Sequence, residues 1–402
     1  MNKNIKKWGF SDKDVELFKI IQLFAFAAAF LLIALLMRRA YYDFESWDYT
    51  AFLSEWFEHI KGMPGLSGFG ADISDYTPMY KYIITIMTKL ETDSLTMYKN
   101  VSVFFDVVMS VFMGLLIYEI TKDKVKGLIT YAITLFMPTV FLNSAVWGQC
   151  DSIFTCFAVM SLYFIVKGKG GVGMAFFALS FSFKLQAIFF LPAIVIYCIK
   201  GKIKLLDLVY FPLTYILCAL PAVFAGQWLY SALIGAYTTQ VGEYPWITAN
   251  APNIYQILPE FYEDAKLIKM LVFFSLGVLC IIGTLLLYNK KEFNVKKMVV
   301  LAYLFAVLLP YVLPAMHERY FYMADVFAIL FAVLYPKRAY ISVLTVYPSL
   351  RAVVRYLFDN GNTRIDFVLV SFVMLVGVVC LVQFAIEEFN REEEPQIVKS
   401  TR

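Results

Sequence analysis

The residues best suited to chemistry begin with an acidic and aromatic segment at 42–49, which reads YDFESWDY. Asp48 comes just before a stretch, 50–60, whose apolar residues recur at helical spacing and predict an amphipathic helix lying flat on the membrane surface. A carboxylate fixed at the start of a helix can act as a general base. It can also simply cap the helix. The residues leave both interpretations open, and the two are compatible.

Two further aspartates near Asp48 could supply a second carboxylate. Asp43 lies in the same segment, and Asp75 precedes Pro78 in the sequence DYTP. Aspartate is also common in turns, because its side chain hydrogen-bonds the neighbouring backbone, and a turn is the preferred interpretation of Asp75. Either residue therefore stands as an alternative to Asp48.

A second polar cluster lies at 143–152, in the sequence NSAVWGQCDS. Asp151 and Ser152 are expected to cap the helix that follows. Capping does not account for Trp147 and Gln149, which suit a sugar, because a pyranose stacks on an indole and its hydroxyls hydrogen-bond to an amide. We assign Trp147, Gln149 and Asp151 to substrate binding, together with Gln186.

Lys184 interrupts a long apolar run, far from the lysine clusters on either side. A lysine within a membrane segment is costly unless it is paired or faces a polar cavity, so it marks a functional site by default. An anion would be its best partner. The alternative is an internal ion pair with an aspartate such as Asp106.

The stretch MHERY at 316–320 carries a third group of polar residues. The planar guanidinium of Arg319 is a good phosphate ligand. His317 could join it, although one histidine cannot form a metal site and an isolated one is often an interfacial residue. Arg355 could extend the same positive field, with snorkelling to lipid headgroups as its competitor. These residues and Lys184 form the predicted donor phosphate site.

The elements that position these residues must be transmembrane helices. The 402 residues are 60% hydrophobic and 16% charged, with a mean hydropathy of +0.68, whereas a soluble domain has roughly 25% charged residues. Backbone polar groups in lipid must be satisfied within the segment. We therefore predict an all-α, polytopic membrane protein of about 12 transmembrane helices in one domain, 1–402. Its first outer loop covers about 40–95, where 79–90 forms a second surface helix.

Twelve apolar blocks can be drawn as spans, two of them, 172–183 and 187–199, forming a bent hairpin around Lys184. With the N-terminus in the cytoplasm, well over half of the 35 lysines and arginines fall on inner pieces of the chain, as the positive-inside rule requires. Arg38 and Arg39 are exceptions. All the polar clusters above then lie on the extracytoplasmic face. The inner loops are too short for a nucleotide-binding domain.

Taken together, these stretches resemble the GT-C superfamily of multispanning glycosyltransferases. The sequence looks most like bacterial relatives of the mannosyltransferase that adds the second mannose to glycosylphosphatidylinositol. It is also similar to the glucosyltransferases that extend lipid-linked oligosaccharide in the endoplasmic reticulum. The resemblance rests on four stretches in family order, namely 48–56 with 75–78, 147–152, 183–186 followed by 191–192, and 317–322.

The resemblance implies that Asp48 is the catalytic base of an inverting hexosyltransferase in a bacterial plasma membrane. A polyprenyl-phosphate sugar would be the donor, and a glycan, glycolipid or protein the acceptor, with no nucleic acid involved. Chemistry agrees, since nucleotide sugars are absent outside the membrane and a departing phosphate needs cations. One base and no covalent nucleophile imply inversion. The paired Asp-x-Asp form of some members is absent, so a divalent metal stays open, and no other cofactor is assigned.

Two other classes of membrane protein remain as alternatives. A polysaccharide ligase or polymerase also uses lipid-linked sugars, but it is expected to rely on arginines and a histidine in a large outer loop. A secondary transporter would show related halves, and no internal repeat is visible here. The sugar and the acceptor stay undetermined.

Overall fold

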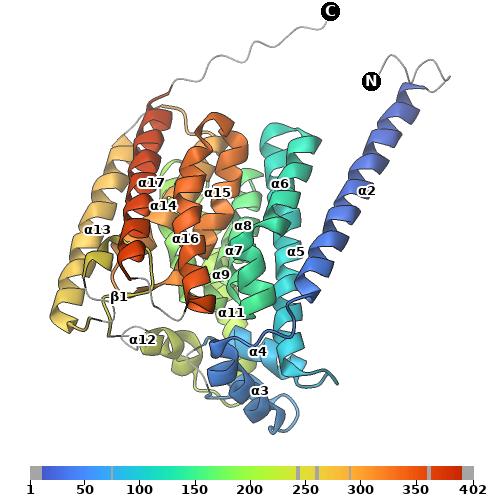
Figure 1. Cartoon of the computed structure of the whole chain (residues 1–402), viewed down its shortest axis with the longest axis vertical. Helices are drawn as coiled ribbons and strands as arrows, with labels where there is room; N and C mark the ends of the chain where they lie inside the picture. Colours follow the sequence, from blue (N-terminus) through green and yellow to red (C-terminus); the bar gives the residue numbers. More distant parts are fainter. Residues whose placement is uncertain are drawn as a thin grey trace, which may run out of the picture.

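The computed structural model describes residues 11–73, 76–240, 245–258, 262–288, 291–359 and 364–391. These residues form a helical bundle (Figure 1). Within it, α14 (Val295–Val312) is buried from Lys297 to its end. The helices at two edges, α2 (Asp12–Arg39) and α13 (Ala265–Tyr288), instead expose large apolar side chains such as Phe24 and Phe273. This distribution fits lipid around the bundle and protein at its centre.

Each of the twelve apolar blocks of the sequence corresponds to a helix. Besides α2, α13 and α14, they are α5 (Ser94–Thr121), α6 (Lys124–Phe136), α8 (Asp151–Val166), α9 (Gly170–Phe183), α10 (Leu191–Ile199), α11 (Tyr210–Phe224), α15 (Tyr322–Leu334), α16 (Tyr340–Phe358) and α17 (Arg364–Asn390). Among the described residues, seven helices are long and apolar enough to cross a membrane, or eight with one bent pair. The protein is therefore an all-α, multi-pass membrane protein, and the count of twelve spans stays a prediction.

One end of the bundle carries the short helices α3 (Ser54–Lys61), α4 (Pro78–Met87) and α12 (Ala236–Gln240), which lie across the lower end in Figure 1. We call this the site end. The start of α2 and the end of α17 lie at the opposite end.

The helix after Asp48 differs from its prediction. It begins as a π-helical turn, η2 (Tyr49–Leu53), and continues as α3. Its apolar residues Leu53, Phe57 and Ile60 are at most 4% exposed and pack into the protein core. The expectation that these three residues face the membrane is therefore wrong, because the bundle itself covers them, whereas Phe52 is 39% exposed. Helix α4 is likewise mostly buried, and its ten residues are too few to span.

Two breaks in the helices bring polar segments into the site end. Helix α6 stops at Met137, and α7 (Pro138–Phe141) continues into the π-helical turn η4 (Leu142–Trp147) after a bend of 47°. Proline favours this break because it lacks a backbone N–H. The second break is Lys184, whose backbone is extended between α9 and the 3₁₀ turn η5 (Leu185–Phe190). The predicted hairpin thus has its break at the expected residue.

Arg38, at the end of α2, is one of the two arginines that depart from the positive-inside rule, and it has a partner inside the bundle. Arg38 is 1% exposed, and its Nε and NH2 groups donate to Asp106 Oδ2 at 3.2 and 3.0 Å. Ser144 donates to the same oxygen at 2.5 Å. Asp106 is thus the partner of Arg38 rather than of Lys184, which corrects the pairing considered from the sequence.

The topology can be tested by labelling single cysteines with a membrane-impermeant maleimide in intact cells, after the native cysteines have been replaced. Cysteines at Ser67 and Asp359, both at the site end, should react from outside. A cysteine at Lys291 should react only after the cells are opened. Labelling of position 291 in intact cells would reverse the orientation.

Candidate active site

The centre of the candidate site is the carboxylate of Asp48, which is 7% exposed. Its Oδ2 accepts hydrogen bonds from Arg319 NH1 at 2.7 Å, Trp147 Nε1 at 3.0 Å and Gln149 Nε2 at 2.5 Å. Its Oδ1 accepts one from the Tyr356 hydroxyl at 2.5 Å. Four donors from three distant parts of the chain therefore hold one carboxylate.

This geometry excludes the helix-capping interpretation of Asp48. The residue stands directly before η2, but its side chain makes no capping hydrogen bond to that turn. Three donors saturate Oδ2, whereas Oδ1 receives a single bond from the described residues and keeps lone-pair capacity. A carboxylate fixed in this way can accept a proton at Oδ1.

Trp147 and Gln149 lie at the site but act differently from the prediction. Trp147 is 0% exposed and Gln149 is 3% exposed. The indole ring stacks on the Tyr356 ring, with centroids 4.6 Å apart, and the Arg319 guanidinium lies 5.6 Å from its centroid. No face of the indole is therefore open to a sugar in this structure, and both side chains orient Asp48 instead.

Lys184 lies in the same end of the bundle, paired with a different carboxylate. Its Nζ is 2.5 Å from Asp151 Oδ1, and both side chains are buried. Asn143 Nδ2 donates to the other oxygen of Asp151 at 2.9 Å. The Tyr76 and Phe154 rings each lie 5.9 Å from the ammonium. Asp151 is thus the partner of Lys184 rather than a helix cap, and the internal ion pair considered from the sequence exists with this partner.

The segment around Arg319 is fixed by a small parallel sheet. Strand β1 (Thr248–Ala249) pairs with β2 (Met316–His317), directly before the 3₁₀ turn η9 (Glu318–Phe321). The backbone of Ala315, just before β2, has a φ of 58°, which is unfavourable for alanine. Such strain persists where the surroundings enforce it, commonly at functional sites. Arg319 Nε is buried and, within the described residues, has no hydrogen-bond partner, so this arginine keeps donor capacity.

The two residues before Arg319, His317 and Glu318, have shifted pKa values. Burial lowers the pKa of His317 to about 3, and the charge of Arg319 adds to the effect. Burial raises the pKa of the Glu318 carboxyl to about 7, which Arg319 opposes and the Asp48 carboxylate reinforces. His317 is therefore neutral at pH 7, so it can only hydrogen-bond to a phosphate, without a positive charge.

The remaining predicted residues lie at varying distances from Asp48. Arg355 is 3% exposed and donates to Asn250 Oδ1 at 2.9 Å, so it makes a contact inside the protein instead of snorkelling to lipid headgroups, the alternative considered for it. Gln186 is buried two residues beyond Lys184. Asp43 is exposed on the loop before Asp48. Asp75 lies outside the described residues.

The sequence reasoning missed two residues of the site, Tyr356 and Glu318. Tyr356 follows Arg355 on α16, and a tyrosine near the end of an apolar helix gives no signal beyond an interfacial preference. Glu318 lies inside the MHERY stretch, and its position next to Arg319, between two apolar blocks, was the signal that the sequence offered. Within the described ranges, no group of three or more histidine, cysteine, aspartate or glutamate residues could hold a metal ion.

Comparison with known families bears on the middle of the chain. Residues 75–230 match the family described as dolichyl-phosphate-mannose-protein mannosyltransferase. This match supports the GT-C resemblance. It indicates a membrane glycosyltransferase, although it covers less than half of the chain, and it includes Trp147, Gln149, Asp151 and Lys184 but neither Asp48 nor Arg319. No curated protein matches the chain.

The raised pKa of Glu318 predicts a pH-dependent stability. The folded-state pKa of about 7 lies above the ordinary value of 4.5. The contribution of Glu318 to the free energy of unfolding is therefore fully present below about pH 4.5 and is lost as the pH rises through about 7. The melting temperature of the wild type should therefore fall relative to Glu318→Gln between about pH 5 and 8. The contribution of His317 cancels in this difference. Parallel melting profiles of the two proteins would contradict the assignment.

Proposed function

We propose that this protein is an inverting hexosyltransferase, of mannose or glucose type, which uses a polyprenyl-phosphate sugar at the extracytoplasmic membrane face. The observation that carries the proposal is the buried Asp48 carboxylate held by Arg319, with the Lys184–Asp151 pair at the same end of the bundle. One carboxylate and two cations are the groups that transfer from a lipid phosphate requires. The family match adds independent support for sugar transfer.

The proposed reaction is a single displacement at the anomeric carbon of the donor sugar. The acceptor hydroxyl oxygen forms a bond to that carbon while the bond from the carbon to the phosphate oxygen breaks. Asp48 Oδ1 takes the hydroxyl proton, and the lipid phosphate leaves with the bonding electrons. Arg319 Nε and the ammonium of Lys184 stabilise the charge that develops on the phosphate. Inversion follows because one displacement occurs.

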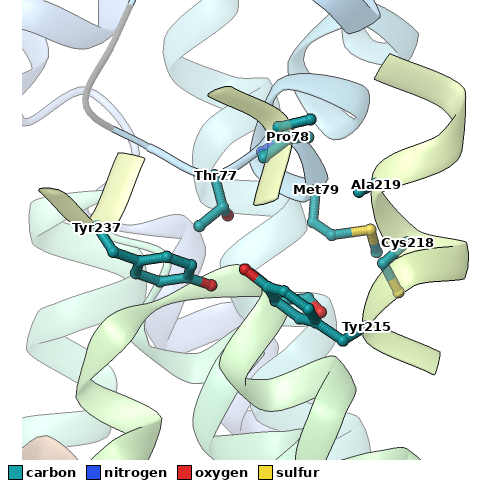
Figure 2. Close-up of a pocket in the computed structure, with 9 residues that line it drawn as sticks. Thr77, Pro78, Met79, Tyr215, Cys218, Ala219 and Tyr237 are labelled. Carbon is teal, nitrogen blue, oxygen red and sulfur yellow. The ribbon is translucent and has the colours of Figure 1, made fainter. Parts of the chain in front are cut away.

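A small pocket lies near the break between α9 and η5. It is lined by residues of α4, α9, α11, η7 (Ser231–Gly235) and α12. Figure 2 shows Met79 and Ala219 on its wall and the hydroxyl groups of Tyr215 and Tyr237 turned toward each other. Thr77 at its edge donates to the carbonyl oxygen of Phe183 at 3.1 Å. The pocket therefore borders the chain one residue before Lys184.

The catalytic role is tested with purified protein in nanodiscs, radiolabelled polyprenyl-phosphate mannose or glucose, and a total membrane extract of the source cells as acceptor. Asp48→Asn should lower the transfer rate by on the order of a hundred- to ten-thousand-fold, because an amide cannot accept the proton. Donor affinity should remain. Asp43→Asn, at an exposed position, is the matched control, and Asp75→Asn tests the other alternative. A near-normal rate for the position 48 variant would end the assignment.

The phosphate role of Lys184 requires a paired design, because its removal leaves the Asp151 carboxylate buried without a partner, which is strongly destabilising. Lys184→Met alone should lower both thermal stability and donor affinity. The double variant Lys184→Met with Asp151→Asn should regain stability while donor affinity stays reduced by roughly tenfold or more, as for a lost charge-assisted bond. Arg319→Met should weaken donor binding as well as the rate.

If the double variant regained donor affinity together with stability, the Lys184–Asp151 pair would be structural only. The phosphate would then have to bind elsewhere in the site. Affinity is measured by equilibrium binding of the labelled donor without acceptor, so this result does not depend on knowing the acceptor.

A further inference from the structure

Lys99, in the second turn of α5, binds the segment that leads from α2 to Asp48. Its side chain is 0% exposed, and its Nζ lies 2.9, 2.9 and 2.6 Å from the carbonyl oxygens of Tyr41, Tyr42 and Phe44. An ammonium has three N–H donors, so all of them are used on this short segment. A buried lysine is normally paired with an acid, whereas this one is matched to three backbone groups.

The same turns of α5 hold the second segment that forms the site. Ser102 donates to the carbonyl oxygen of Gln149 at 2.6 Å, and Ser152 donates to the carbonyl oxygen of Ser102 at 3.0 Å. The Lys99 side chain also lies against Gly148, where an added Cβ would be 3.8 Å from Lys99 Cγ. Gly148 itself has a φ of 75°, a conformation that glycine adopts without strain.

These contacts place one side chain between the segment before Asp48 and the turn that carries two of its donors. The ammonium of Lys99 donates hydrogen bonds to the segment before Asp48. The aliphatic part of the same side chain lies against Gly148, in the turn between Trp147 and Gln149. A third link, from the Tyr98 hydroxyl to the carbonyl oxygen of Leu53 at 2.9 Å, fixes the far end of η2 to the same helix. The start of α5 is thus a common platform for both segments.

We propose that Lys99 is a positioning residue, which sets the placement of Asp48 relative to Trp147 and Gln149 through the backbone carbonyls it binds. The inference rests on the proposed catalytic role of Asp48. Its energetic basis is that a displacement of about 1 Å in a reacting group can cost on the order of a hundred-fold in rate. Lysine suits this role because its three donors radiate from one point, while a planar guanidinium covers three carbonyls less evenly.

The test combines hydrogen–deuterium exchange, donor binding and transfer assays on the full-length protein in nanodiscs. In Lys99→Met, amides of residues 41–49 should exchange roughly tenfold faster, since the segment loses its anchor. The transfer rate should fall on the order of a hundred-fold, with donor affinity within twofold of the wild type. Lys99→Arg should recover part of the rate and of the protection.

Lys81→Met is the matched control for removing a buried lysine at the site end. Lys81 is 1% exposed and donates to the carbonyl oxygen of Ala71 at 2.6 Å, away from the segment before Asp48. This variant should speed exchange around residue 71 but leave residues 41–49 protected and the rate within a few-fold of the wild type. If Lys99→Met does not fold, Ser102→Ala should loosen residues 147–152 and lower the rate with unchanged donor affinity.

The inference is overturned if Lys99→Met leaves the exchange of residues 41–49 unchanged, or if exchange rises while the transfer rate stays normal. An equal fall in rate for Lys81→Met would also overturn it, because truncating any buried lysine would then suffice. Failure of the proposed function has a different signature. In that case Asp48→Asn keeps its rate, while the exchange result for Lys99→Met is unaffected.

Discussion

The burial of the Asp48 carboxylate is the constraint on which the rest of the site depends. A charged group that is 7% exposed must be matched by donors, and its own neighbours in the sequence do not supply them. They come from residues 99, 101, 271 and 308 positions away along the chain. Each of those segments must therefore reach the site end with its polar side chain turned inward, and this requirement explains the interruptions in the helices.

The interruptions occur where the donors are needed. Asp48 and Trp147 adjoin π-helical turns, Lys184 is an extended residue between two helices, and Arg319 follows a two-residue strand. π-Helical turns are rare and are frequent at functional sites. Regular helices would satisfy the backbone but would carry these side chains past the site. At these residues the chain departs from regular geometry at the site end, where polar side chains can satisfy the exposed backbone groups.

Other charged residues in the bundle help to hold the segments of the site together. The Arg38–Asp106 pair joins the end of α2 to α5, and Ser144 ties Asp106 to the turn before Trp147. Lys99 works from the same helix on the segment before Asp48. A broken ion pair in such surroundings is strongly destabilising, so these contacts hold the two segments of the site in register. The family match begins after Asp48 and ends before Arg319. It therefore contains only part of the carboxylate site, which the folded chain completes.

The sequence by itself determined the class of the protein and the position of its polar residues. Long apolar blocks require helices in a membrane. The clusters around Asp48, Trp147 and Arg319 stood out as polar groups next to such blocks, and Lys184 stood out because a lysine within an apolar run is costly. Which of these residues touch was beyond the sequence. The choice between Asp106 and Asp151 as partner of Lys184, the burial of Trp147, and the contact from Tyr356 all depend on how separate helices pack. Helical periodicity reports the apolar face of one helix, but not which neighbouring helix covers it or which side chain meets a given carboxylate.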